Sequence, residues 1–291
     1  MDVLARARTA AALALLLNAF TWGVSWWPFR RLQAAGVHPL WATVLIYMVA
    51  TLAIVAWRRE APLQLLRTPA LWWLVLASGT TNAAFNWGVT IGDVVRVVLL
   101  FYLMPLWAVL LARLLLGEPL TARALVRVAL ALAGAAVVLR PEGGGWPLPH
   151  KLAEWLGVLG GFSFALNNVL LRREAAAPEA ARALAMFAGG ALVAGTLVIA
   201  LAADGAVAAL PPPSPGWLAG VFGLGLWFLM GNLALQYGAS RLPANVTAVV
   251  MITEVVFASV SAVLLGAGAM SPSLALGGAL IVGGALLAAR D

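Results

Sequence analysis

Residues 94–116 read VVRVVLLFYLMPLWAVLLARLLL, an apolar run whose only charges, Arg96 and Arg113, lie near its two ends. A helix needs about 20 predominantly apolar residues to cross the hydrocarbon core of a bilayer. Similar runs fill the rest of the chain, at 9–29, 39–57, 70–90, 122–139, 153–171, 182–203, 216–238, 244–266 and 272–289. The runs are continuous and do not alternate, and hydrocarbon demands internally paired backbone groups, so helices are favoured over a barrel. The sequence predicts an all-α integral membrane protein with ten transmembrane helices.

The composition leaves no room for a soluble domain. Apolar residues make up 63% of the 291 residues, charged residues only 10%, and the mean hydropathy is +0.98. The formal net charge of +7 comes from arginines at the ends of the runs. It therefore indicates membrane topology and contact with anionic lipid, and we expect no nucleic-acid partner.

Several function classes lack their motifs in this sequence. There is no cysteine, which excludes disulfides and thiolate sites, and no Walker-type phosphate loop. His38 and His150 lie outside the apolar runs, so neither a metal cluster nor a serine–histidine pair at membrane depth is expected. We therefore expect no cofactor, no metal site and no enzymatic activity.

The arginines also predict the orientation in the membrane. With the N-terminus in the cytoplasm, thirteen arginines lie at cytoplasmic ends of the runs, as the positive-inside rule requires. The outer ends hold only five basic residues: Arg30, Arg31, Arg96, Arg140 and Lys151. The first residues have features of a signal peptide, but run 9–29 is long enough to span and is expected to stay as the first helix. We predict a multi-pass protein of the bacterial inner membrane with both termini in the cytoplasm.

The two halves of the sequence resemble each other. Three segments recur in the same order, at offsets of 142, 150 and 149 residues: 20–31 with 162–173, 82–88 with 232–238, and 115–117 with 264–266. Because each half holds five predicted helices, an odd number, the second half is expected to be inverted relative to the first. We predict a first repeat at 1–141, a periplasmic connecting loop at 142–152 and an inverted repeat at 153–291. Such repeats are typical of secondary transporters, and the alternative is a duplicated membrane scaffold without transport.

A family resemblance covers essentially the whole chain. Its motifs are Trp22-Gly23 in the first helix, Leu103-Met104-Pro105 in the fourth, Leu116-Gly117-Glu118-Pro119-Leu120 after it, and Gly134 in the fifth. Together with the ten-helix pattern, they resemble the drug/metabolite transporter superfamily, EamA type, and most of all its bacterial aromatic amino acid exporters. The second repeat departs from the family pattern, because the 149-residue offset places Glu254 opposite Pro105 and Ala267 opposite Glu118.

Glu254 is the strongest single candidate for a functional group. It lies near the middle of the ninth run, between Met251-Ile252-Thr253 and Val255-Val256-Phe257. A charged group at this depth costs a few kcal/mol on insertion scales, and such residues usually face an interior cavity. We expect Glu254 either to couple transport to protons or to bind a substrate amine. The alternative is a neutral acid that hydrogen-bonds a neighbouring helix.

Aromatic and amide side chains in the middle of the runs are the other candidate ligands. Trp22, Trp107 and Trp227 lie away from the interface, where an indole N–H favours a cavity over lipid. The mid-run amides are Asn18, Asn82, Asn86, Asn167, Asn168, Asn232 and Gln236, with Tyr102 and Ser163 as weaker candidates. Amides can bind a carboxylate or an amine without a buried charge. The alternatives are plain helix packing for the indoles and interhelical hydrogen bonds for the amides.

Taken together, these features predict a secondary transporter that exposes a mid-membrane site alternately to each side. Pro105 breaks a backbone hydrogen bond and is the expected gating position. The resemblance implies export of small organic solutes, with aromatic amino acids favoured. The expected partners are this solute, the lipid bilayer and, through Glu254, protons. The alternatives are a multidrug or other metabolite exporter of the same fold and, less favoured, a membrane enzyme or scaffold.

Overall fold

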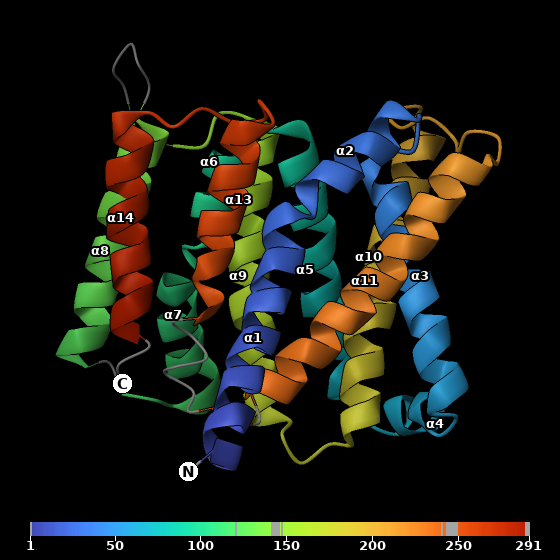
Figure 1. Ribbon diagram of the computed structural model, residues 1–291, viewed down its shortest axis with the longest axis horizontal. Coiled ribbons are helices and arrows are strands. Elements are labelled where there is room, and N and C mark those ends of the chain that lie inside the picture. Colours follow the sequence, from blue (N-terminus) through green and yellow to red (C-terminus); the bar gives the residue numbers. More distant parts are fainter. Residues whose placement is uncertain are drawn as a thin grey trace.

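The computed structural model describes residues 2–119, 121–140, 146, 148–239, 241–242 and 250–288, and within these ranges it contains helices and no strand (Figure 1). The helices are α1 (Asp2–Val24), α2 (Trp26–Ala34), α3 (Pro39–Trp57), α4 (Ala61–Leu66), α5 (Leu71–Ile91), α6 (Val94–Phe101), α7 (Met104–Leu116), α8 (Ala122–Leu139), α9 (Leu152–Arg173), α10 (Glu179–Ala203), α11 (Pro215–Ala239), α13 (Thr253–Leu264) and α14 (Pro272–Ala288). The predicted all-α class is confirmed.

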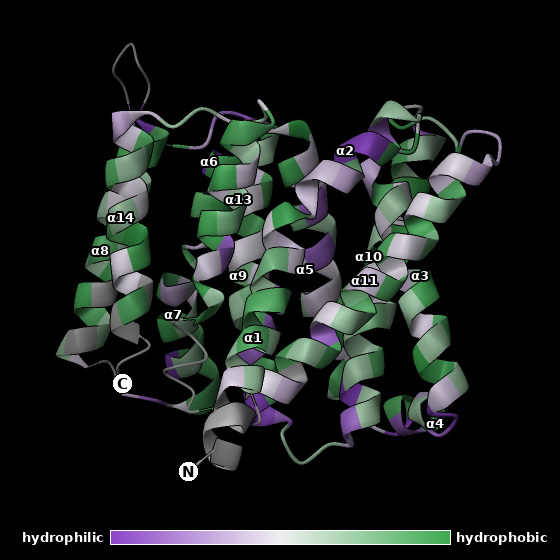
Figure 2. Ribbon diagram, in the orientation of Figure 1, coloured by the Kyte–Doolittle hydropathy of each residue, from purple (hydrophilic) through white to green (hydrophobic). Residues whose placement is uncertain are grey.

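Among the described residues, five helical segments are long and apolar enough to cross a membrane. They are Thr9–Ala34, Pro39–Trp57, Val94–Leu116, Glu179–Ala203 and Pro215–Leu235. Hydrophobic residues cover most of the helical ribbons (Figure 2). Large apolar side chains such as Leu52, Ile199 and Leu264 are mostly exposed, as expected of a surface that contacts lipid. This is a multi-pass membrane protein, and the full ten-span arrangement remains a prediction.

Two of the predicted runs are broken, and a proline explains each break. The first run divides at Ser25 into α1 and α2, and run 94–116 divides at Tyr102 and Leu103 into α6 and α7. Pro28 and Pro105 have no N–H, so the carbonyl groups four residues earlier lose their helical partners. Pro105 itself lies in the first turn of α7, where a missing N–H has no cost.

A third break lies at an equivalent place in the second half. Helix α13 begins at Thr253 after a turn at Ile252. The 149-residue offset aligns Ile252 with Leu103, which lies in the break between α6 and α7. Each half of the chain therefore interrupts a helix at the same position of the predicted repeat.

The helices of one half make contacts that correspond to those made by the equivalent helices of the other half. Helix α1 packs against α11 and α13, while α9, the first helix of the second half, packs against α5 and the α6–α7 pair. In the same way α5 packs against α10 and α3 against α11. The α3–α10 and α8–α14 pairs each join corresponding helices of the two halves.

Local sequence signals fix the ends of several helices. Asp93 begins α6 by accepting the backbone N–H of Arg96 at 2.9 Å, and Thr121 begins α8 by accepting that of Ala124 at 3.1 Å. Gly117, with φ of +71°, ends α7 in the left-handed conformation that glycine adopts without strain. These signals fix the start of α6 and α8 and the end of α7.

Candidate functional site

A cavity of about 330 Å³ lies between the two halves of the chain, a size typical of small-molecule sites. Helices α1, α3, α5, α9, α10, α11 and α13, with the α6–α7 break, contribute its walls. The described lining residues are Asn18, Trp22, Tyr47, Ser78, Thr81, Asn82, Phe85, Phe101, Tyr102, Met104, Phe164, Asn167, Asn168, Met186, Phe187, Asn232, Leu235, Met251 and Glu254.

The cavity lies nearer to one end of the bundle. We call the end where the chain begins the N-terminal end and the opposite end, where α2 lies, the far end (Figure 1). Helix α5 enters at the N-terminal end and lines the cavity between Ser78 and Phe85, whereas α11 leaves there and lines it at Asn232 and Leu235. Toward the far end, side chains such as Trp26, Val89 and Val97 are buried in close packing. The structure is therefore closed at the far end.

A tyrosine joins the two helix breaks inside the cavity. The Tyr102 hydroxyl lies between α6 and α7 and donates to Glu254 Oε2 at 3.2 Å. It also lies 3.3 Å from the carbonyl oxygen of Met251, just before α13. Glu254 occupies the first turn of α13 and is only 8% exposed. Across the described lining, Glu254 is the only acidic side chain, and no lysine, arginine or histidine accompanies it.

The amides that line the cavity differ in how fully the protein pairs them. Asn82 is satisfied, because its Oδ1 accepts from the Tyr47 hydroxyl at 2.6 Å and its Nδ2 donates to the Ser78 carbonyl at 2.9 Å. Asn18 Nδ2 donates to the Gly231 carbonyl at 2.8 Å. The Oδ1 atoms of Asn18 and Asn167, both buried, have no hydrogen-bond partner in the described part of the chain. A buried unpaired acceptor costs about 1–3 kcal/mol.

Aromatic rings form the apolar walls of the cavity. Trp22 stacks on Phe228 with ring centres 4.7 Å apart, and its other neighbour is the edge of Phe85 at 6.4 Å. From Phe85 the contacts continue to Phe101 at 4.9 Å and from there to Phe164 at 5.4 Å. The walls therefore suit a solute with a flat apolar body.

The structure brings together six of the residues that the sequence singles out as substrate ligands. Those that line the cavity are Trp22, Asn82, Tyr102, Asn167, Asn232 and Glu254, and two further mid-run amides, Asn18 and Asn168, also line it. The side chain of the predicted ligand Gln236 lies outside the described residues.

Four predicted ligands and the predicted gate lie elsewhere. Asn86 is fully buried one turn beyond Asn82 and donates to the Thr43 hydroxyl at 3.2 Å. Trp107 packs edge-on against Phe162 at 5.5 Å, and Trp227 packs in the same manner against Phe20 at 6.4 Å.

The other two are buried in helix packing. Ser163 is buried on α9 and does not appear in the described lining. Pro105 is also buried, and it lies beside the cavity at the start of α7. A role for Pro105 in gating would therefore act through the helix break and not through contact with solute.

Sequence reasoning missed most of the apolar wall and three hydroxyl groups. The missed residues are Tyr47, Ser78, Thr81, Phe85, Phe101, Met104, Phe164, Met186, Phe187, Leu235 and Met251. Tyr47 donates to Asn82, so a tyrosine in the middle of the second run was a signal that could have been used.

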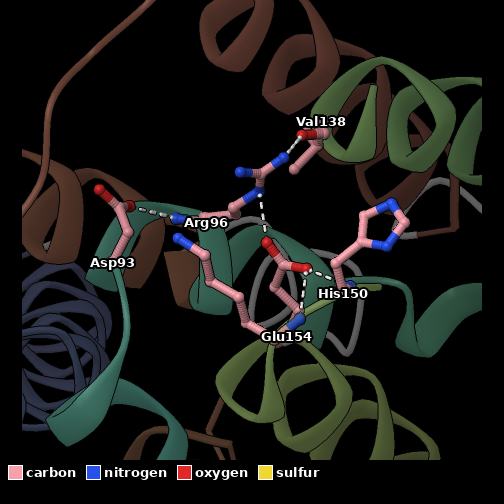
Figure 3. A network of polar contacts seen from close by, with 6 residues as sticks. Asp93, Arg96, Val138, His150 and Glu154 are labelled. Atoms are coloured by element: carbon pink, nitrogen blue, oxygen red, sulfur yellow. Dashed lines mark hydrogen bonds and ion pairs between the residues drawn. The ribbon is translucent and has the colours of Figure 1, made fainter. Parts of the chain in front are cut away.

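A network of charged and backbone groups links helices at the far end, and Figure 3 shows it from close by. Arg96 of α6 and Glu154 of α9 form an ion pair, with Nε and Oε1 3.2 Å apart. Arg96 also donates to the carbonyl of Val138 at the end of α8. Glu154 Oε2 accepts the backbone N–H groups of His150 at 2.7 Å and Lys151 at 3.2 Å. Three helices are thus joined at this end.

A second arginine at the far end joins α2 to α5. Arg30 Nε donates to the carbonyl of Thr90 at 3.1 Å, and its Nη2 donates to the carbonyl of Gly92. These are carbonyls at the C-terminal end of α5, where a helix has unpaired acceptors and a cation is favourable.

A model of the EamA-like transporter family matches residues 9–140. This match covers less than half of the chain, and the matched segment is similar to membrane transporters of this family. Among solved structures, one described only as a crystal structure of a protein is similar to this chain, with 22% sequence identity and a TM-score of 0.59. The match covers 96% of each chain. At this identity the likeness shows the fold alone. No curated protein matches the sequence.

Proposed function

We propose, starting from the EamA-like match, that this protein is a secondary transporter that exports small organic solutes by alternating access. The observation that carries the proposal is the cavity between the two halves, which is closed by packing and arginine contacts at the far end. A site near mid-membrane that faces one side at a time is what such transport needs.

Two observations support an inverted repeat of five helices in each half, with ten spans in all. Equivalent helices of the two halves make corresponding contacts. The helix breaks at Leu103 and Ile252 also occupy equivalent positions. Interrupted helices at corresponding places in two repeats are the usual sign of a transport site. The proposed units remain 1–141 and 153–291, joined by a periplasmic loop at 142–152.

The proposed solute has a flat apolar part, which matches the aromatic walls. Aromatic amino acids are the leading candidates, because the motifs of the first half resemble exporters of these compounds. A multidrug or other metabolite exporter is the second candidate, because the apolar walls would also accept hydrophobic drugs. Counterflow driven by tryptophan but not by a panel of drugs favours the first candidate, and the reverse result favours the second.

The orientation proposed is that of a bacterial inner-membrane protein with both termini in the cytoplasm. Exposed arginines at the N-terminal end, among them Arg58, Arg59, Arg67, Arg172 and Arg173, support this orientation. The cavity then faces the cytoplasm, from which an exporter loads its solute. Glu254 is the residue through which protons could be coupled to transport.

Cysteine labelling tests alternating access, because the chain has no native cysteine. Met186 lines the cavity and Val97 is 1% exposed in the closed far half. A membrane-impermeant thiol reagent added from the N-terminal end is expected to modify a Met186→Cys variant at least tenfold faster than a Val97→Cys variant. Bound solute is expected to slow labelling of the first variant. Equal labelling rates for the two variants would contradict the closed far end.

A further inference from the structure

The described lining of the cavity contains one charged side chain, and it is acidic. Glu254 is the only ionisable acid in the described lining, and no basic side chain faces it. Within the described lining a solute carboxylate therefore has no cationic partner, and it would be repelled by Glu254 when both are ionised.

Most hydrogen-bond donors of the described lining are already paired with protein acceptors. The hydroxyl groups of Tyr47, Ser78, Thr81 and Tyr102 are already donated to protein acceptors. The amide nitrogens of Asn18, Asn82 and Asn167 each donate to one residue, namely Gly231, Ser78 and Asn168, and the exposed Asn168 is the amide whose nitrogen stays open to a solute.

Two amide oxygens, by contrast, remain without a donor. They are the Oδ1 atoms of Asn18 and Asn167. The assignment of Asn18 is fixed by chemistry, because the Gly231 carbonyl can only accept and must face the amide nitrogen. Unpaired buried acceptors in a native structure call for an explanation, and a donor on a bound ligand supplies one.

From this inventory we infer that the cavity recognises a protonated amine on an aromatic body and discriminates against a carboxylate on the same solute. An ammonium group brings three donors and no acceptor, which suits a cavity whose described lining holds one carboxylate and two unpaired amide oxygens. The aromatic rings that surround them also attract a cation through their faces. This inference rests on the proposed transport function and narrows its substrate class to aromatic amines, ahead of the corresponding amino acids.

Three indole compounds separate these possibilities, because they share one ring and differ only in charge. Tryptamine carries the amine alone, tryptophan carries both groups, and indole-3-propionate carries the carboxylate alone. With the purified full chain in lipid nanodiscs, tryptamine is expected to bind at least tenfold more tightly than tryptophan. Indole-3-propionate is expected to bind more weakly still.

A Glu254→Gln variant provides the matched control, because it keeps the shape and removes the charge. In this variant the affinity for tryptamine is expected to fall at least tenfold, and the difference between tryptamine and tryptophan to shrink to about twofold. Tryptophan binding as tightly as tryptamine to the native chain, or unchanged discrimination in the variant, would overturn the inference while leaving transport intact. Failure of all three compounds to bind or to exchange would overturn the inference and the aromatic amino acid candidate together, whereas alternating access is tested separately by the cysteine labelling.

Discussion

Replacing Trp22 with alanine is expected to lower the rate of solute counterflow at least tenfold. Trp22 lines the cavity and presents the largest ring of its aromatic wall, held by the stacked Phe228 at 4.7 Å. Aromatic contacts of this kind are worth about 0.5–1.5 kcal/mol beyond the area that they bury. A loss of about 1.4 kcal/mol corresponds to a tenfold change in affinity. Counterflow in proteoliposomes at solute concentrations below saturation measures the effect.

Trp227 offers a matched control for this prediction. It lies on α11 one residue before Phe228, but its ring packs against Phe20 and lies outside the described lining of the cavity. Trp227→Ala is expected to keep counterflow within about twofold of the native rate, and Trp22→Phe is expected to restore part of the loss. Equal losses in the two alanine variants, or no loss in Trp22→Ala, would show that the cavity wall does not bind the solute.

Replacing Glu154 with alanine is expected to destabilise the protein by about 3 kcal/mol, because it leaves a largely buried arginine without its partner. The side chain of Glu154 is 6% exposed and that of Arg96 is 27% exposed. The same change also removes the acceptor of the backbone N–H groups of His150 and Lys151. Reversible unfolding in mixed micelles with increasing denaturing detergent measures the difference.

The control pair also involves α9, but it lies at the other end of the bundle. Arg172 of α9 pairs with Glu118, just after α7, and their side chains are 64% and 42% exposed. Exposed ion pairs contribute at most about 1 kcal/mol, so Arg172→Ala is expected to change stability by less than that. A loss for Glu154→Ala no larger than the loss for Arg172→Ala would contradict the role assigned to the far-end network.

The sequence alone predicts the helices well, because their apolar runs are long and bounded by turns. Run 39–57 coincides with α3 and run 122–139 with α8. The breaks in α1–α2 and α6–α7 are less visible, because they depend on which carbonyl a proline leaves unpaired. Pro28 carried that signal in the first run, where the sequence reading expected an unbroken helix.

The cavity could be predicted only in part, for two physical reasons. A membrane helix is apolar on all sides, so its sequence does not show which face points to the inside of the protein. Phe85, Phe101 and Phe164 therefore cannot be distinguished in the sequence from rings that face lipid. The sequence also does not show at which level along a helix the cavity lies. Asn82 and Asn86 lie on the same face of α5, yet only Asn82 reaches the cavity, while Asn86 lies in the packed far half and pairs with Thr43.

Polar groups at mid-membrane gave the clearest signal, since hydrocarbon tolerates them only where a partner or a cavity exists. Glu254 and Tyr102 lie in the cavity and hydrogen-bond each other across the two halves. The 149-residue offset could not predict this bond, because it compares the halves without placing them in contact.

Counterflow of labelled tryptamine and tryptophan in proteoliposomes tests the central claim most directly. In vesicles that contain the purified protein and an excess of the unlabelled compound, the account predicts transient accumulation of label above its equilibrium level, saturable with concentration. The same vesicles without protein set the rate of passive leak. Label entry that equals this leak for both compounds would contradict a transport cavity between the two halves of the chain.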